Sequence, residues 1–384
     1  MTLNQNSSQT EPDINTVYCS VEVSRSSWVI GVYCPTTDTA IGTHKLEAAD
    51  TSALLELVRK KQDRIGPPAT VLLCYEAGYE GFWLVRYLNH QAPDIDVVVL
   101  DPASLQIDRR AKKVKTDRMD ALRMIRALKA WHSGDSDALS RVRVPSVEEE
   151  DRRRLIRERD TLLADRQRGL NRIKGLLYLH GIFDLQPKAR DLIPRLIDTP
   201  TGYGDPFPPH TLAQIGRIKE SLDKIDDHIA IIENQRDEMV KTGKEADPGT
   251  VENMAATLTK VRGIGTNDAT MLATEVFSRD FQNRRQLGSW AGLTSAPWSS
   301  GTVDHDQGIT KAGPARVRKH LIQMAWRWLH FQPTSKLTLW YKERTKDGHG
   351  RNRRRMIVAL ARKLLVALWK LATKGEVPAG VIVT

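Results

Sequence analysis

The chain has only three cysteines, and their spacing fits neither a metal site nor a disulfide framework. Cys19, Cys34 and Cys74 are far apart in the sequence, with no Cys-x-x-Cys pair. A zinc ribbon or a disulfide-rich secreted domain is therefore not indicated. Because each cysteine falls in an apolar run typical of a strand, we expect three buried thiols in a reducing compartment.

Long hydrophobic runs are also missing. The most apolar helical pattern, residues 356–371, is interrupted by Arg362 and Lys363, so no segment reaches the length needed to span a membrane. Residues 1–12 are polar and contain no apolar core, which argues against a signal peptide. We expect residues 1–15 to be disordered and the protein to have no membrane partner.

The last fifth of the 384-residue chain is poor in acidic residues. Residues 301–384 carry 17 Lys and Arg but only 5 Asp and Glu, whereas the formal net charge of the whole chain is +11. Such a basic block favours a polyanionic partner, and nucleic acid is favoured over an acidic membrane surface. The alternative is a solvated surface that only keeps the protein soluble.

Residues 16–132 show the pattern of an α/β domain. Alternating apolar residues predict strands at 17–23, 28–34 and 40–46, and the short connections between them indicate an antiparallel meander. A helix at 52–62, a strand at 70–75, a helix at 82–88 and a strand at 96–100 follow. The order of these elements is that of a ribonuclease-H-like fold.

Four carboxylates stand out in this domain. Glu22 interrupts an apolar strand, Glu76 ends a later strand, and Asp117 and Asp120 open a helical pattern behind the basic segment that ends at Lys115. A charge within an apolar strand costs several kcal/mol unless it is paired or bound to a metal. Converging carboxylates suit Mg²⁺ or Mn²⁺, and two such ions about 3.5–4 Å apart serve phosphodiester chemistry. The alternative for the aspartates is helix capping and interaction with the helix dipole.

Residues 145–250 read as two long helices separated by a proline-rich break. The first has a heptad seam, and the second has apolar residues at alternating spacings of three and four; their seam positions are Ile156, Leu163, Leu170, Leu177, Leu212, Ile215, Ile218, Leu222, Ile225, Ile229 and Ile232. These helices can form a coiled-coil hairpin within one chain or associate with another protomer. The sequence leaves both open, and we favour oligomerisation.

Residues 251–384 predict a mainly helical C-terminal domain. The glycines of Arg262-Gly263-Ile264-Gly265, ahead of a helix, match a helix-hairpin-helix turn, in which Gly263 and Gly265 would let backbone amides approach a phosphate. A plain tight turn is the alternative. Residues 297–301 read as a loop that contains Ser300, and the spacing of Trp326 and Leu329 places both in the core. Candidate phosphate contacts are Lys311, Arg316, Arg318, Arg353, Arg354 and Arg355.

The combination of motifs resembles the DEDD-type transposases of bacterial insertion sequences. In the first domain the resemblance lies in Val21-Glu22-Val23-Ser24-Arg25, Tyr75-Glu76-Ala77-Gly78 and Lys115-Thr116-Asp117-Arg118-Met119-Asp120-Ala121. In the last domain it lies in Arg262-Gly263-Ile264-Gly265, Trp290-Ala291-Gly292-Leu293-Thr294, Ser300-Gly301 and Thr310-Lys311-Ala312-Gly313. It covers nearly the whole chain, from about residue 17 to residue 377.

The resemblance implies a RuvC-like nuclease domain at 16–132, a coiled-coil stalk at 145–250 and a serine-bearing transposase domain at 251–384. It implies that Glu22, Glu76, Asp117 and Asp120 hold Mg²⁺ and that Ser300 attacks double-stranded DNA, donor and target, to form a phosphoserine link. It further implies a dimer or tetramer, in which one protomer's carboxylates meet another's serine, and a structured bridge RNA that guides recognition. The resemblance also implies a bacterial protein that is cytoplasmic and associated with the nucleoid.

Three positions depart from the family's usual pattern. Glu22 stands where aspartate is usual, Ser295 stands where proline is usual, and only the rule of serine before glycine selects Ser300 over Ser299. Two other functions stay open on the sequence alone. One is a RuvC-like nuclease or resolvase that only hydrolyses strands, and the other is a non-catalytic nucleic-acid-binding protein.

Overall fold

The computed structural model describes residues 15–67, 69–78, 81–101, 116–300, 303–311, 313–346, 348 and 350–383. For residues 296–300, 303–307 and 351 it describes the backbone only. The chain divides into two compact units, Met1–Ser146 and Val147–Thr384. Two predictions fall on residues that lie outside the described parts of the chain. They are the disordered N-terminus, except for residue 15, and Lys115 with the basic segment before it.

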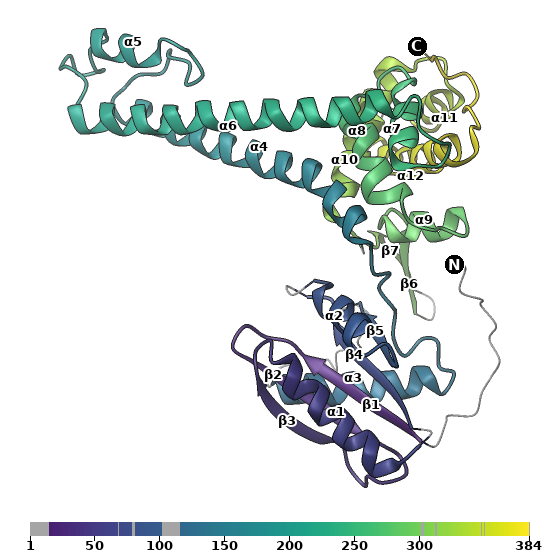
Figure 1. The fold of residues 1–384 in the computed structure, drawn as a ribbon. Helices are drawn as coiled ribbons and strands as arrows, with labels where there is room; N and C mark the ends of the chain where they lie inside the picture. Colours follow the sequence, from purple (N-terminus) through teal and green to yellow (C-terminus); the bar gives the residue numbers. More distant parts are fainter. Residues whose placement is uncertain are drawn as a thin grey trace. The chain divides into compact units, whose positions relative to one another are not determined.

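The first unit is built on a five-stranded mixed sheet (Figure 1). Its strands are β1 (Thr16–Glu22), β2 (Ser27–Tyr33), β3 (Gly42–Glu47), β4 (Thr70–Glu76) and β5 (Ile95–Leu100). The order in the sheet is β3-β2-β1-β4-β5. The first three strands form the predicted antiparallel meander, and β4 and β5 join parallel to β1. The sheet is consistent with the ribonuclease-H-like domain expected from the element order.

Helices cover both faces of this sheet. On one face, Val17, Cys19 and Val21 of β1 pack with α1 (Thr51–Ile65) and α2 (Trp83–Gln91). On the other, Tyr18 of β1 and Cys74 of β4 pack with α3 (Asp117–His132). Successive strand residues point to opposite faces, so the alternation read from the sequence is confirmed.

The helix α3 packs very closely on β1 and β2. The Ser20 hydroxyl donates a hydrogen bond of 2.8 Å to the Ala121 carbonyl oxygen. On the neighbouring strand, a Cβ added at Gly31 would lie 2.6 Å from Ser20 Oγ and 3.1 Å from Ile125 Cγ1. Gly31 is therefore required by the close approach of the helix to the sheet.

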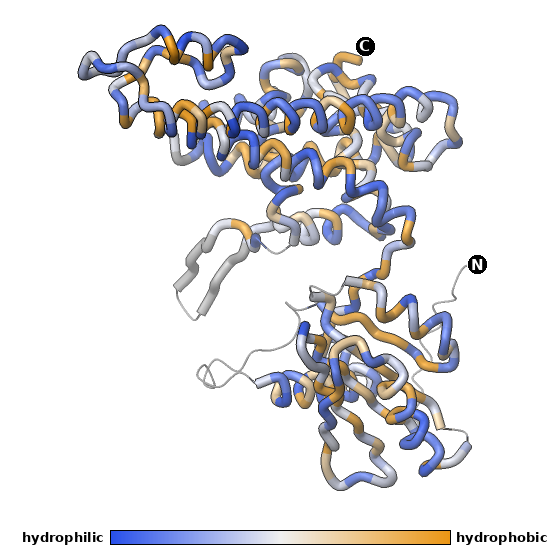
Figure 2. The backbone as a smooth tube through the Cα atoms, turned by 60° about the vertical axis from the view of Figure 1, so that its left-hand side comes forward, coloured by the Kyte–Doolittle hydropathy of each residue, from blue (hydrophilic) through white to orange (hydrophobic). Residues whose placement is uncertain are grey.

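The second unit begins with two long helices that lie side by side, α4 (Val147–Leu179) and α6 (Pro209–Thr242), with α5 (Leu192–Asp198) between them in sequence (Figure 1). Most of the predicted seam is buried, including Ile156, Leu170, Leu177, Ile215 and Leu222. The ion pairs Arg159–Glu233 and Arg166–Asp226 flank the seam. Hydrophobic residues recur at intervals along both helices among hydrophilic stretches (Figure 2). The apolar seam is thus covered by intrachain packing.

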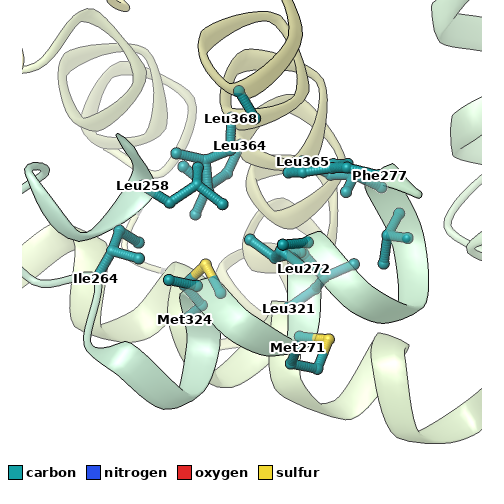
Figure 3. Close-up of a cluster of buried hydrophobic side chains, with 14 of the residues drawn as sticks. Leu258, Ile264, Met271, Leu272, Phe277, Leu321, Met324, Leu364, Leu365 and Leu368 are labelled. Atoms are coloured by element: carbon teal, nitrogen blue, oxygen red, sulfur yellow. The ribbon is translucent and has the colours of Figure 1, made fainter. Parts of the chain in front are cut away.

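The rest of the second unit is a helical bundle with one hairpin. Its elements are α7 (Val251–Thr259), α8 (Thr266–Met271), the π-helical η3 (Leu272–Phe277), α9 (Arg284–Trp290), β6 (Ser295–Ser300), β7 (Val303–Ile309), α10 (Ala315–Phe331), α11 (Lys336–Arg344) and α12 (Gly350–Lys374). Figure 3 shows the core, where Leu258, Leu272, Leu321 and Leu364 from four different elements meet.

Two sequence predictions for this unit are wrong. Residues 297–300 were expected in a loop, but they belong to β6, which pairs antiparallel with β7. The segment was mistaken for a loop because serine and proline are common in loops. Trp326 was expected in the core, but its side chain is 48% exposed, and Trp328 is the buried tryptophan of α10.

The cysteine prediction is confirmed: Cys19, Cys34 and Cys74 are buried free thiols. Burial raises the pKa of Cys19 to about 12, because a thiolate would lose its hydration. Among the described residues, no helix is both long and apolar enough to cross a bilayer.

Replacing Gly31 by alanine tests the packing of α3. The new methyl group would overlap Ser20 Oγ, so we expect Gly31→Ala to destabilise the first unit by about 1–3 kcal/mol. Calorimetry of the full chain should show a lower Tm for that unit's transition. Gly42→Ala on β3 is the matched control, because its Cβ would lie no closer than 3.6 Å to any atom. Equal shifts for both variants would contradict the close-packing explanation.

Candidate active site

Two of the four predicted carboxylates lie at adjacent strand ends. Val21 of β1 pairs with Tyr75 of β4 in parallel register, so Glu22 and Glu76 occupy the next position on neighbouring strands. Both follow the alternation that places Tyr18 and Cys74 on the α3 face. Parallel pairing therefore brings these two carboxylates to one edge of the sheet, on the side covered by α3.

The orientation of α3 carries its first turn towards the same edge. His132, at the end of the helix, accepts or donates a 2.8 Å hydrogen bond with the Tyr18 hydroxyl, whereas Ala121 lies at Ser20. The helix thus runs antiparallel to β1, and its start, with Asp117 and Asp120, lies in the direction of Glu22. The four carboxylates thus come from the ends of β1 and β4 and from the first turn of α3.

The N-cap of α3 is Thr116, whose hydroxyl accepts a hydrogen bond from the Met119 amide. Asp117 is exposed in the first turn, and the Asp120 carboxylate pairs with Arg123 at 3.0 Å. Capping is therefore performed by the threonine. The aspartates still have a favourable interaction with the helix dipole.

The donor set at this edge suits a hard divalent cation, since every side chain supplies oxygen. One oxygen each of Glu22 and Asp120, Oε2 and Oδ2, is shielded from solvent. Across the described parts of the chain, however, no group of three or more Asp, Glu, His or Cys side chains lies close enough to hold a metal ion. Like-charge repulsion opposes such a group when no cation is bound, so the chemistry of the set fits Mg²⁺ although the ligands are not gathered.

Ser300 ends β6, and the hairpin holds its backbone in a defined register. Ser300 lies opposite Val303, and His305 lies opposite Trp298, two positions along. At the base of the hairpin, the Thr310 amide donates to the Thr294 carbonyl oxygen at 2.9 Å.

The predicted helix-hairpin-helix turn joins α7 to α8. Gly263 has a φ of +91°, and a Cβ there would lie 2.6 Å from Phe331 Cβ. Gly263 is thus required by packing against α10. Gly265 has open space around it. Among the other predicted contacts, Lys311 is exposed and Arg318 is half-buried, and Arg353, Arg354 and Arg355 at the start of α12 are exposed.

Arg316 is half-buried and is bound by two carboxylates that are not part of the sequence motifs. It forms ion pairs with Glu275 and with Asp160, the latter at 3.4 Å. Arg157 also binds Glu275, at 2.8 Å. The Glu275 side chain is only 5% exposed; burial opposes its ionisation, but Arg157 and Arg316 bring its pKa below the ordinary value. This ion network joins α4, η3 and α10.

His320 extends the network to α8. Hydrogen bonding to Asp160 and then to Asp268 raises the pKa of His320 from 6.5 to about 9. Asp268 also pairs with Arg327. Like Glu22, Glu275 is a carboxylate within an apolar run of the sequence. The criterion that selected Glu22 could therefore have selected Glu275 as well. Asp160 lies in a highly charged helix and gives no such signal.

Comparison with known proteins places both units in one family. A profile of the family described as Transposase IS116/IS110/IS902 matches residues 255–339, and a DEDD transposase profile of the IS110 group matches residues 33–182. The candidate transposase y4rJ of Sinorhizobium fredii is 42% identical over 378 residues, which cover 96% of this chain and 95% of that protein. The chain belongs to the IS110 family of transposases. The family resemblance proposed from the sequence is confirmed.

More distant relatives belong to named insertion elements. The transposase of IS1111A from Coxiella burnetii is 27% identical over 270 residues, 69% of this chain and 68% of its own length. The transposase of IS1328 from Yersinia enterocolitica is 26% identical over 227 residues, 58% of this chain and 63% of its own length. The protein is accordingly a transposase, an enzyme that cleaves and recombines DNA.

The ion network predicts a pH dependence of stability. His320 is protonated in the folded transposase at pH values where it is neutral in the unfolded chain. Its contribution to stability is therefore complete below pH 6.5 and is lost as the pH rises towards 9. We expect the Tm of the second unit to fall across this range, as followed by calorimetry.

His320→Gln should flatten this dependence, and His330→Gln, at an exposed position on the same helix, should retain it. An unchanged pH profile in His320→Gln would contradict the assignment.

Proposed function

We propose that the transposase cuts and rejoins DNA through a covalent phosphoserine intermediate on Ser300, with Mg²⁺ or Mn²⁺ held by Glu22, Glu76, Asp117 and Asp120. The main support is the parallel register of β1 and β4, which sets Glu22 beside Glu76 where α3 begins. Carboxylates from two strand ends and a helix are the arrangement that a RuvC-like site needs.

The reaction requires activation of a weak nucleophile. The Ser300 hydroxyl loses its proton, its oxygen bonds to phosphorus, and one bond from phosphorus to a deoxyribose oxygen breaks, with that oxygen leaving as a hydroxyl after taking up a proton. A serine hydroxyl needs a base or a metal for this step. Bound divalent cations would lower the pKa of the nucleophile and offset the charge that develops on phosphate. The phosphoserine link conserves the bond energy for rejoining.

The active site is proposed to be shared between protomers of a dimer or tetramer. The carboxylates belong to the first unit and Ser300 to the second, and the two units separate at Ser146. Because α4 and α6 pack on each other within one chain, association is proposed to use other surfaces. The sequence expectation that the α4–α6 seam is free for another protomer receives no support from the packing.

A bridge RNA is proposed to supply sequence recognition through base pairing, while the protein grips backbone and shape. The excess of cations in residues 301–384, 17 against 5 acidic residues, supports a nucleic-acid partner of this kind. The RNA would then select the donor and target DNA. Ser300 would act on the DNA strand that base pairing with the RNA brings to it.

The serine assignment predicts a covalent adduct. Wild-type protein incubated with labelled DNA carrying the element's end, its RNA and Mg²⁺ should form a complex that survives denaturing electrophoresis. Ser300→Ala should remove the adduct because no nucleophile remains, and Ser299→Ala, the adjacent control, should keep it. Equal cleavage by wild type and Ser300→Ala without any adduct would instead favour a hydrolytic nuclease.

The shared site predicts complementation between two inactive variants. Ser300→Ala and Asp120→Asn should each lack activity alone, but their mixture should regain part of it, because some oligomers combine an intact carboxylate set with an intact serine. Recombination product is measured as a function of the mixing ratio. A mixture as inactive as its components would show that each protomer supplies its own complete site.

A further inference from the structure

The second unit contains a basic groove that lies outside the ion network. The α9–α12 groove has a volume of about 750 Å³ and is lined mainly by residues of α9 and α12, together with Leu337 of α11. Its cationic lining residues are Arg284, Arg285, Arg362, Lys363 and Lys370. None of the residues that line it is acidic. A concave surface with this charge attracts a polyanion.

These cations are available to a ligand. Arg284, Arg285 and Arg362 are exposed and form no ion pair with any described residue. Lys363 lies over the Trp340 ring at 4.7 Å, and Lys370 pairs with Glu376 on the exposed surface. A competing surface groove of about 900 Å³, between α4, α8 and α10, differs in that its Arg316, His320 and Arg327 are neutralised by Asp160, Asp268 and Glu275. Internal carboxylates neutralise these cations of the surface groove, whereas Arg284, Arg285 and Arg362 of the α9–α12 groove form no ion pair with any described residue.

The groove leads directly to the strand that ends in Ser300. Thr294 lines the groove, and β6 begins at the next residue. Ser300 lies five positions after Ser295, which corresponds to about 17 Å along an extended strand. The cations of α12 extend from Arg362 to Lys370, about 12 Å of helix, which matches roughly three to four nucleotides of one DNA strand.

The groove also has apolar lining residues, Leu337, Val366 and Ala367. The sugar rings of a bound DNA strand can pack on these side chains while its phosphates meet the cations. A second hollow shares Arg285 and Ser289 with the groove and adds the polar residues Gln282, Asn283 and Gln286, so polar side chains continue along α9 beyond the groove.

We propose that the α9–α12 groove binds the phosphate backbone of the DNA strand that flanks the bond attacked by Ser300. The position of the bound strand relative to the cut rests on the function proposed above, but the binding of DNA by the groove does not. The groove holds the DNA a few nucleotides from the hairpin, and its contacts are to phosphates, so they are independent of base sequence.

The test measures the salt dependence of binding to a short labelled DNA duplex. We expect the triple variant Arg284→Gln/Arg285→Gln/Arg362→Gln to lower the slope of log K against log salt by up to about 2.7, and to weaken binding at least tenfold near 100 mM salt. The triple Arg→Lys variant should restore the slope, because it keeps the charges. Ser289→Glu, an exposed substitution that leaves every cation in place, should also weaken binding by repelling phosphate.

Lys224→Gln is the matched control, since it removes an exposed cation on α6 that pairs with Glu220; it should leave binding unchanged. A wild-type slope and affinity in the triple variant would overturn the proposal. So would a loss of binding to an RNA duplex of the same sequence with DNA binding intact.

The adduct assay separates this inference from the proposed reaction. If wild-type protein forms the Ser300 adduct while the triple variant binds DNA normally, the groove assignment fails alone. The opposite result is that the triple variant has the lower salt slope of DNA binding but wild-type protein never forms an adduct. In that case DNA binding in the groove stands and the phosphoserine mechanism fails.

Discussion

The parallel pairing of β1 with β4 is the constraint on which the candidate active site depends. The register fixes Glu22 and Glu76 at equivalent positions on adjacent strands. Their charges can be accommodated there only at an edge of the sheet, where water, a cation or Arg and Lys side chains can reach them. The same sheet positions α3, because Ser20 and Gly31 leave room for the helix to approach and give its backbone a hydrogen bond. The packing of small residues thus decides where Asp117 and Asp120 lie.

The second unit uses its charges in two different ways. Around Glu275, buried carboxylates hold Arg157, Arg316 and His320, so these cations join the long helices to the bundle. A buried carboxylate is costly unless several donors surround it, which explains why three elements converge on this one residue. In the α9–α12 groove none of the lining residues is acidic, and Arg284, Arg285 and Arg362 form no ion pair with any described residue. The net charge of the chain does not distinguish these two roles.

Local patterns predicted the elements of the first unit well. Alternation in β1 and the short connections to β2 and β3 indicated the meander, and the apolar runs of β4 and β5 indicated buried strands. The predictions failed where the local sequence is compatible with more than one structure. Proline, serine and glycine near Ser300 are compatible with a loop as well as with a hairpin. On α10, the sequence pattern did not show that Trp328 rather than Trp326 faces the core.

The sequence by itself determined the family, the identity of the candidate carboxylates and serine, and the concentration of cations at the C-terminal end. These depend on residue types and spacing, which are visible in one dimension. Only the tertiary structure decided that the α4–α6 seam is covered within the chain, that Arg316 is bound by Glu275, and that Arg284, Arg285 and Arg362 line one groove. Arg285 and Arg362 are distant in sequence, and their proximity follows from how α9 packs on α12 around Gly288. Long-range packing of this kind leaves no periodic trace in the sequence.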